Sequence, residues 1–397
     1  MLNIEEPYPH KTAFLQLGFR PFFAASMAFA VLAIMAWMLF YLNGWSPLST
    51  RYPAMLWHAH EMIFGYAMAV VAGFLLTAIR NWTNLPTLNN SPLLGLLLLW
   101  LAARLLPLSG AEALLPLAAI LDLGFGLLLF FAALWPVARA RQWKQAGIVS
   151  KLLLMFAANL AFYLGLFGVL PDGGRIGLYA GFYLILALIL TMIRRLIPFF
   201  IEKGLDQPFQ AKNNRWLDIA SLVLFVLFAI ADLVEPYGQL TAILAISQFF
   251  LHAVRLFNWH HPALWKKPLL WAIYSAYAWI TLGFLLKALS IWAGFSPFIA
   301  VHSFAYGGIG MITLGMMTRV ALGHTGRNVF APPPQLGAIF LLLSLGAIFR
   351  IVVPIFDSTH YLWWVAIAQV FWILAFAATL IIYLPMLIRA RIDGRPG

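Results

Sequence analysis

The order of apolar and polar residues predicts a chain built from long hydrophobic helices. The apolar runs are close to the ~20 residues that a helix needs to cross the ~30 Å hydrocarbon core of a bilayer. They do not alternate as the residues of a strand do, so we predict an all-α integral membrane protein with about twelve transmembrane helices. The predicted spans are Arg20–Leu42, Leu56–Ile79, Pro92–Leu106, Ala111–Trp135, Val149–Val169, Ile176–Phe199, Trp216–Val234, Gln239–Phe257, Leu269–Trp292, Ser296–Met317, Leu336–Ile355 and Tyr361–Ile388.

The composition predicts a surface that is covered mostly by lipid. Of the 397 residues, 63% are hydrophobic and 10% are charged, whereas a soluble domain has about 25% charged residues. The sequence contains no cysteine, which excludes disulfides, thiolate metal sites and iron–sulfur clusters. No hydrophilic stretch separates the runs, so we predict one polytopic domain over residues 1–397. The first run is long enough to be a helix and not a cleavable signal peptide.

The distribution of lysine and arginine predicts the orientation. If the helices are placed in order, five of the 25 basic residues lie on one side and the other 20 lie on the side that carries both termini. The richer side is cytoplasmic by the positive-inside rule, so segment 1–17 and tail 389–397 are cytoplasmic. The net charge of +12 therefore reflects topology, and no long basic patch suggests a nucleic-acid partner. The five residues on the other side are Arg51, Arg104, Arg175, Lys287 and Arg350.

Histidines and acidic residues inside membrane helices are candidates for function. His58 and His60 lie in the stretch Trp57–Met62 at the outer end of the second helix. Residues three or four apart share a helix face, so His58 should share a face with Glu61 and Met62, and His60 should point elsewhere. The two histidines would then serve two sites, or one would bind a metal while the other forms hydrogen bonds. The ordinary alternative is an interfacial pair among aromatic residues.

His302 lies early in the tenth helix, which also enters from the outer side. At 1.5 Å per residue, its estimated depth overlaps that of His58 and His60. Gly307, Gly308 and Gly310 follow and thin the helix surface, which would leave room for a flat macrocycle. Close packing between helices is the ordinary explanation of such glycines.

A third group lies on the inner side of the membrane. His252 and Arg255 lie late in the eighth helix, and His324 lies in the loop that follows the tenth. His252 is too deep to share an outer site with His302, so a second site is the better hypothesis. Two carboxylates, Asp122 and Asp232, lie within helices and could relay protons or pair with neighbours.

Several sequence stretches resemble the NnrS family of bacterial membrane proteins. They are Gly18–Phe23, Trp57–Gly65, Gly73–Ala78, Asn81–Thr83, Met316–Arg319 and Leu322–Arg327, and the resemblance runs nearly end to end. It implies b-type haem, copper as a second metal, a role in nitric oxide metabolism or nitrosative stress, and a bacterial cytoplasmic (inner) membrane. His260, His261 and His360 fall outside these stretches.

The second helix is also similar, more distantly, to that of haem–copper oxidase core subunits. His58, Met62, Phe64 and Gly73 match the spacing around a haem-ligating histidine there, and His302 falls on the tenth helix, which also carries ligands in those subunits. The sixth and seventh helices lack the copper-binding histidines of the oxidases. An oxidase-type binuclear centre is therefore not expected.

Together these features predict a haem-binding membrane protein. We expect an outer haem iron held by His302 and one of His58 and His60, with His58 preferred. We expect His252 and His324 to form a cytoplasmic-half site for copper or a second haem, Arg255 and Arg319 to bind carboxylates such as haem propionates, and Glu61 and Asp122 to relay protons.

The expected partners are membrane lipid, nitric oxide as ligand or substrate, and a quinol or protein electron donor. The sequence leaves open whether the protein is a nitric oxide-processing oxidoreductase. The alternative function is a transition-metal transporter or permease that uses the same histidines, which would have helices broken at mid-membrane and a water-filled cavity.

Overall fold

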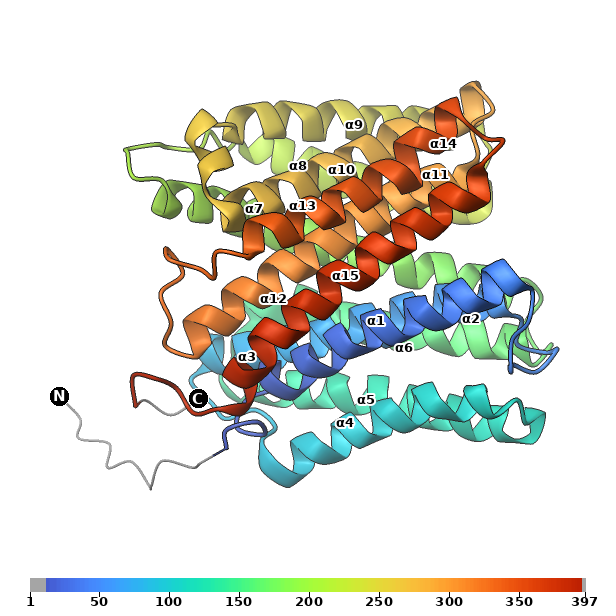
Figure 1. Cartoon of the computed structure of the whole chain (residues 1–397), viewed down its shortest axis with the longest axis horizontal. Helices are drawn as coiled ribbons and strands as arrows, with labels where there is room; N and C mark the ends of the chain where they lie inside the picture. The colour runs from blue at the N-terminus through green and yellow to red at the C-terminus, as the bar shows by residue number, and fades with distance from the viewer. Residues whose placement is uncertain (1–11, 395–397) are drawn as a thin grey trace. The chain divides into compact units, whose positions relative to one another are not determined.

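The computed structural model describes residues 12–394, and this part of the chain is helical without a β-strand (Figure 1). Within these residues, 12 helical segments are long and apolar enough to cross a membrane. The predicted fold class and number of spans are therefore confirmed, and the chain is a multi-pass membrane protein. Lys11 and Arg395 lie outside the described residues, as do the outermost parts of segment 1–17 and tail 389–397.

Six spans are single α-helices, namely α1 (Phe19–Asn43), α7 (Gly173–Gly204), α8 (Arg215–Val234), α9 (Gln239–Trp259), α10 (Pro268–Trp292) and α15 (Tyr361–Ile388). Three spans join an α-helix to a 3₁₀ turn, namely α4 (Asn90–Leu105) with η2 (Leu106–Ser109), η3 (Glu112–Leu114) with α5 (Leu115–Arg139), and η4 (Trp143–Gln145) with α6 (Ala146–Leu166). The short turn η5 (Pro262–Lys266) connects α9 to α10.

The other three spans contain a π-helical segment. They are α2 (Ala54–His60), η1 (Glu61–Ala67) and α3 (Met68–Thr83); α11 (Pro297–His302), η6 (Ser303–Gly310) and α12 (Met311–His324); and α13 (Leu336–Ala347), η7 (Ile348–Val352) and α14 (Val353–Phe356). Two of the π segments begin directly after a candidate histidine, His60 or His302. Such segments are rare and often mark functional sites.

The chain divides into two compact units. Unit 1 contains Met1–Gly181, Met317–Pro332 and Phe376–Gly397, and unit 2 contains Phe182–Met316 and Pro333–Ala375. The division falls inside α7, α12 and α15, so each of these helices contributes to both units.

In unit 1, α1 packs against α3 and η1, and α5 packs between α4 and α6. Two of the stretches that resemble the NnrS family meet here. A Cβ atom at Gly73 of α3 would lie 2.8 Å from the ring of Phe23 in α1, and one at Gly18 would lie 2.6 Å from Cβ of Leu76. These glycines therefore let α1 and α3 approach closely.

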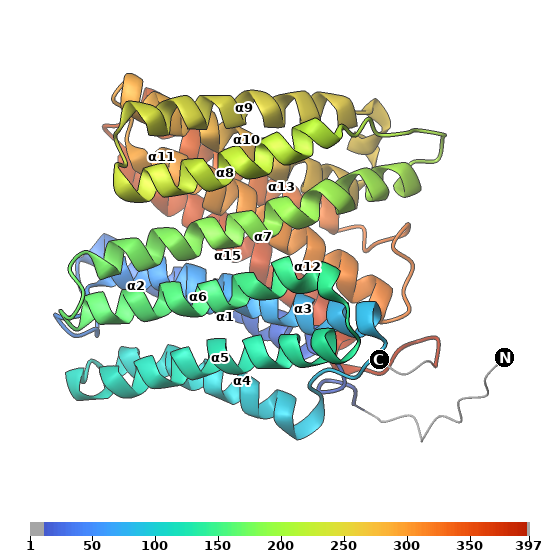
Figure 2. The ribbon, with the colours of Figure 1, turned by 180° about the vertical axis from the view of Figure 1, so that it is seen from behind.

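In unit 2, α10 is the central helix and contacts α9, α11 and η6; α8, α9 and α10 can be followed from behind in Figure 2. A side chain at Gly307 would overlap Trp279 of α10, and one at Gly310 would overlap Trp372 of α15. Protein side chains therefore occupy the space beside these two glycines, as expected for close helix packing.

One predicted position is wrong. His324 was expected in a loop, but α12 continues as far as His324, which is the last residue of the helix. The hydroxyl of Thr325 donates to the carbonyl oxygen of Ala321 at 2.7 Å, and Gly326 then adopts φ +77°, which ends the helix. The apolar run stops earlier, at Met317, so hydrophobicity alone placed the helix end about two turns too soon.

Candidate functional site

His58 and His60 have different surroundings in unit 1. The ring of His58 stacks on Trp37 of α1, with centroids 4.5 Å apart and planes 6° apart. His60 is fully buried; its Nδ1 lies 3.2 Å from Oε1 of Glu61 and its Nε2 lies 2.9 Å from Oδ1 of Asn159. Both ring nitrogens of His60 therefore have protein partners, and a metal could reach either only by displacing one of them. Glu61, expected on the face of His58, forms a hydrogen bond with its chain neighbour His60.

A buried group of charges continues from His60. Nη1 of Arg104 in α4 donates to Oε2 of Glu61 at 3.0 Å, and its Nη2 donates to Oδ1 of Asp122 in α5. Asn159 and Tyr163 of α6 donate to the other Asp122 oxygen, at 2.8 and 3.1 Å. We call His60, Glu61, Arg104, Asp122, Asn159 and Tyr163 the ion cluster.

The ion cluster is removed from solvent, since each of its side chains is at most 5% exposed. Burial of charges is costly unless they are paired. The guanidinium of Arg104 lies between two carboxylates. By formal charge these three groups sum to one negative charge, which a protonated His60 would balance. Five helical elements (α2, η1, α4, α5 and α6) are thus joined by ion pairs and hydrogen bonds.

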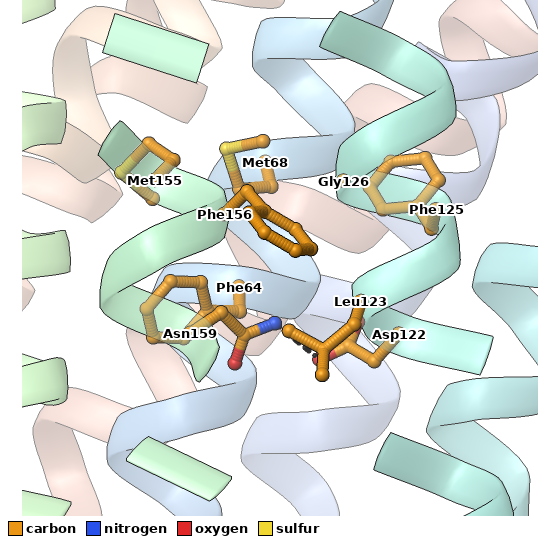
Figure 3. Close-up of a pocket in the computed structure, with 9 residues that line it drawn as sticks. All are labelled: Phe64, Met68, Asp122, Leu123, Phe125, Gly126, Met155, Phe156 and Asn159. Carbon is orange, nitrogen blue, oxygen red and sulfur yellow. Dashed lines mark hydrogen bonds between the residues drawn. The ribbon is translucent and has the colours of Figure 1, made fainter. Parts of the chain in front are cut away.

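A small hollow opens beside Asp122 and Asn159 (Figure 3). The volume in which the centre of a water-sized sphere fits is about 10 Å³. This is roughly enough room for one water molecule. Apolar side chains form most of its wall, and the polar atoms in Figure 3 come from the two ion-cluster residues. The hollow is lined by Phe64, Met68, Asp122, Leu123, Phe125, Gly126, Met155, Phe156 and Asn159.

His302 in unit 2 is oriented by two partners. Its Nδ1 lies 2.8 Å from the carbonyl oxygen of Phe298, which can only accept, so Nδ1 carries the proton and donates. Nη2 of Arg350, in η7, lies 3.2 Å from Nε2 and donates to it. The lone pair of a neutral His302 is therefore on Nε2, the tautomer that histidine ligands fixed by a backbone carbonyl adopt.

His252 of α9 has a buried nitrogen without a partner. Its Nδ1 lies 2.5 Å from the hydroxyl oxygen of Tyr277 in α10, and Phe284 stacks on its ring at 5.4 Å. Its Nε2 is shielded from solvent and has no hydrogen-bond partner among the described residues. An unsatisfied buried polar atom costs about 1–3 kcal/mol, so a group bound at Nε2 would stabilise the protein.

The tyrosine that holds His252 is itself held by charged residues. Nη1 of Arg255 donates to the Tyr277 hydroxyl at 3.2 Å, and Nη2 donates to Asp218 of α8 at 2.8 Å and to Ser221 at 3.1 Å. Arg255 is thus already paired with a carboxylate of the protein, which weakens the expectation that it binds haem propionates.

His324 and His252 belong to different units. The ring of His324 packs against Phe19, with centroids 5.5 Å apart and planes tilted by 42°. The charges that act on His324 are those of Arg391, Arg20 and Arg80. Positive neighbours repel a metal cation, so we do not assign His324 to a metal site. Arg319 is half-buried near the predicted inner end of α12.

The other three histidines among the described residues lie near the surface. His261 accepts from the backbone N–H of Ala263 and so caps η5, and His260 accepts from Trp265. His360 lies 2.9 Å from a carboxylate oxygen of Asp357 in an exposed loop. That bond lowers the pKa of Asp357 below its usual value.

The structure also shows the partners of the candidate carboxylate Asp232. It lies 2.5 Å from Nζ of Lys287 and accepts from the hydroxyl of Tyr183, so this carboxylate pairs with neighbours. Other residues of these networks are not candidates from the sequence. Arg104 was counted only among the outer-side charges, although an arginine within an apolar run is itself a signal of a buried partner. Neither Tyr277 nor Asn159 can be identified as a functional candidate from the amino-acid sequence alone.

Among the described residues, no group of three or more His, Asp or Glu side chains is arranged to hold a metal ion. A metal in this part of the chain would therefore have at most two ligands from His, Asp and Glu side chains. Haem fits this condition better than a bare ion does, because the macrocycle supplies four of the iron ligands and the protein supplies axial histidines.

Comparison with known proteins agrees with the motifs. A family model described as NnrS protein matches residues 13–391, nearly the whole chain. The chain belongs to the NnrS family. The matched region of this NnrS protein contains the ion cluster, His58, His252, His302 and His324. No curated protein matches the chain.

Proposed function

We propose that this NnrS protein binds b-type haem through histidines of its membrane helices and acts in nitric oxide metabolism or the nitrosative-stress response of a bacterial inner membrane. Membership of the family supports the biological role. The observation that carries the haem assignment is Nε2 of His252, a buried imidazole nitrogen that lacks a partner among the described residues. Imidazole is a common axial ligand of haem iron.

His252, His302 and His58 are the residues that we propose to hold haem. Tyr277 orients His252, and the Phe298 carbonyl orients His302. Bound haem would supply an iron that binds diatomic gases and exchanges single electrons. Arg350, which lies beside His302, is suited to a haem carboxylate because its guanidinium can donate two parallel hydrogen bonds.

His60 is better suited to the ion cluster than to iron, because both its nitrogens face oxygen acceptors and would carry protons. Nε2 of His302 faces a donor, Arg350, and so keeps a lone pair that iron could take. We propose that Glu61 and Asp122 of this cluster relay protons, with the hollow beside Asp122 as the place for one water. Copper binding also stays a proposal, and we assign no ligands to this metal. Electrons for any reduction of nitric oxide would come from a quinol or a protein donor.

The test is the visible absorption spectrum of the purified full chain. A Soret band that sharpens on reduction is expected, together with iron in the metal analysis. The variant His252→Ala should lose part or all of this band, and His360→Ala, in an exposed loop, should keep it. A colourless protein purified from haem-replete cells would contradict the proposal, and so would a His252→Ala protein that retains all its haem.

No specific observation among the described residues favours the alternative function of a metal transporter. The described spans are continuous helices, including the three with π segments, whereas a transporter of this kind is expected to have helices broken at mid-membrane. Purified protein that contains divalent metal but no haem would favour the transporter function instead.

A further inference from the structure

A cluster of arginines lies at the cytoplasmic ends of the helices of unit 1. The positive charges of Arg391 and Arg327 act electrostatically on Arg20. In the same way the charge of Arg80 acts on His324, and that of Arg389 acts on Arg327. The backbone brings them together, since Ala13 N–H donates to the Ile388 carbonyl at 2.8 Å and Ile392 N–H donates to the Thr325 carbonyl at 3.3 Å. We call Arg20, Arg80, Arg327, Arg389 and Arg391 the arginine cluster.

Two of these arginines have a structural task. Nη1 of Arg20 donates to the carbonyl oxygens of Leu387 and Arg389, at 2.9 and 2.8 Å, and so caps the end of α15. Arg391 forms a two-bond pair with Asp393 at 2.8 and 2.6 Å and also donates to the His324 carbonyl. Asp393 contributes one negative charge beside the five positive charges of this cluster.

Arg327 has unused binding capacity. Its Nη1 is shielded from solvent and has no hydrogen-bond partner among the described residues. Burial and the neighbouring charge of Arg389 lower the pKa of Arg327, so an anion here would relieve both penalties. The segment that carries Arg327 is the Leu322–Arg327 stretch of the NnrS resemblance, to which the proposed haem function assigns no role.

The position of the arginine cluster indicates the source of the anion. Arg80 lies three residues before the end of the Ala54–Thr83 span, Arg327 three residues after Pro297–His324, and Arg389 directly after Tyr361–Ile388. All three are half-buried or exposed. They therefore lie at the depth where the headgroups of the inner leaflet meet the protein, and basic residues at this depth attract anionic lipids.

We propose that the arginine cluster binds the phosphate of an anionic phospholipid, with Arg327 and Arg389 as the principal donors. Guanidinium groups match phosphate through paired hydrogen bonds. This site is independent of the proposed haem function, since it uses none of the haem-ligand candidates.

The experiment measures thermal unfolding of the detergent-purified full chain while phosphatidylglycerol is titrated in. Each arginine near an anionic surface contributes about a factor of five in affinity. The variant with Arg327→Gln and Arg389→Gln should therefore need about thirtyfold more phosphatidylglycerol for the same rise in Tm. The matched control, Arg139→Gln with Lys144→Gln, removes two other cytoplasmic charges and should behave as the unsubstituted protein does. Phosphatidylcholine and inorganic phosphate at millimolar concentration should give no comparable rise.

Each of the following results would overturn the proposal. An equal phosphatidylglycerol dependence in both double variants would show that these arginines do not bind the lipid. A rise with inorganic phosphate that matches the lipid would indicate a site for free phosphate. Loss of haem from the Arg327 and Arg389 variant with unchanged lipid dependence would assign the cluster to haem carboxylates. If the glutamine variant does not fold, the Arg327→Lys and Arg389→Lys variant keeps the charge and should retain a salt-sensitive lipid effect; its complete loss would also overturn the proposal.

Discussion

The imidazole of His252 and the phenol of Tyr277 are joined by a hydrogen bond of 2.5 Å between Nδ1 and the hydroxyl oxygen. Tyr277 is fixed in turn by Arg255, and Arg255 by Asp218. Because the ring is held at Nδ1, Nε2 is the nitrogen available to a bound group. The orientation of this one nitrogen thus depends on residues from three helices, α8, α9 and α10.

Replacement of Tyr277 by Phe should weaken haem binding without preventing folding. The ring that packs against Trp259 remains, but the oxygen that holds His252 is lost. Loss of a partner of this kind lowers metal affinity by about 10–100-fold. The measurement is haem titration of the apo-protein, followed by absorbance. Tyr274→Phe is the control, because this hydroxyl bonds the Leu256 carbonyl instead; equal affinities in the two variants would contradict the prediction.

His58 and His60 should give opposite results when each is replaced by Ala. The His60 variant should lose stability, because Glu61 and Asn159 each lose a buried partner at a cost of about 1–3 kcal/mol. The His58 variant should lose haem signal with a smaller change in Tm, since His58 stacks on Trp37 outside the ion cluster. Haem content and Tm are measured on the same preparations. The assignment fails if the His60 variant loses haem while its Tm is unchanged.

Arg104→Gln should be among the most destabilising single substitutions in the chain. It leaves two buried carboxylates, Glu61 and Asp122, without their shared cation, and removal of one partner of a buried pair costs about 3–5 kcal/mol. Arg51→Gln, which breaks the exposed pair with Glu112, should cost at most about 1 kcal/mol. Thermal unfolding of both variants in the same detergent gives the comparison. Similar Tm values for the two would show that the buried charges are not coupled.

The topology can be tested directly because the natural chain has no cysteine. Lys144→Cys lies in η4, at the start of the span that contains α6, and should react with a membrane-impermeant maleimide only from the cytoplasmic side. Ser358→Cys, between α14 and α15, should react only from the outer side. Cells and inverted vesicles provide the two sides. Labelling in the reverse pattern would refute the orientation that the positive charges predict.

The sequence alone determined the fold class, the number of spans and the family. Length and hydrophobicity decide these features locally, because a helix in lipid must satisfy its own backbone and needs a fixed length to cross. The span Tyr361–Ile388 was predicted at both ends for this reason. His58 and Glu61 were identified as candidates because charged and titratable residues are rare in apolar helices.

Only the tertiary structure decided which of these residues act together. Arg104 joins Glu61 to Asp122, and Tyr277 holds His252, through side-chain contacts between different helices. Helical periodicity gives the face of a residue but not the neighbour that it meets. The end of α12 at His324 was missed because a threonine side-chain bond and a left-handed glycine set it, not hydrophobicity. Hydrophobic pattern fixes where a helix crosses the membrane, whereas pairing of buried charges depends on how helices pack.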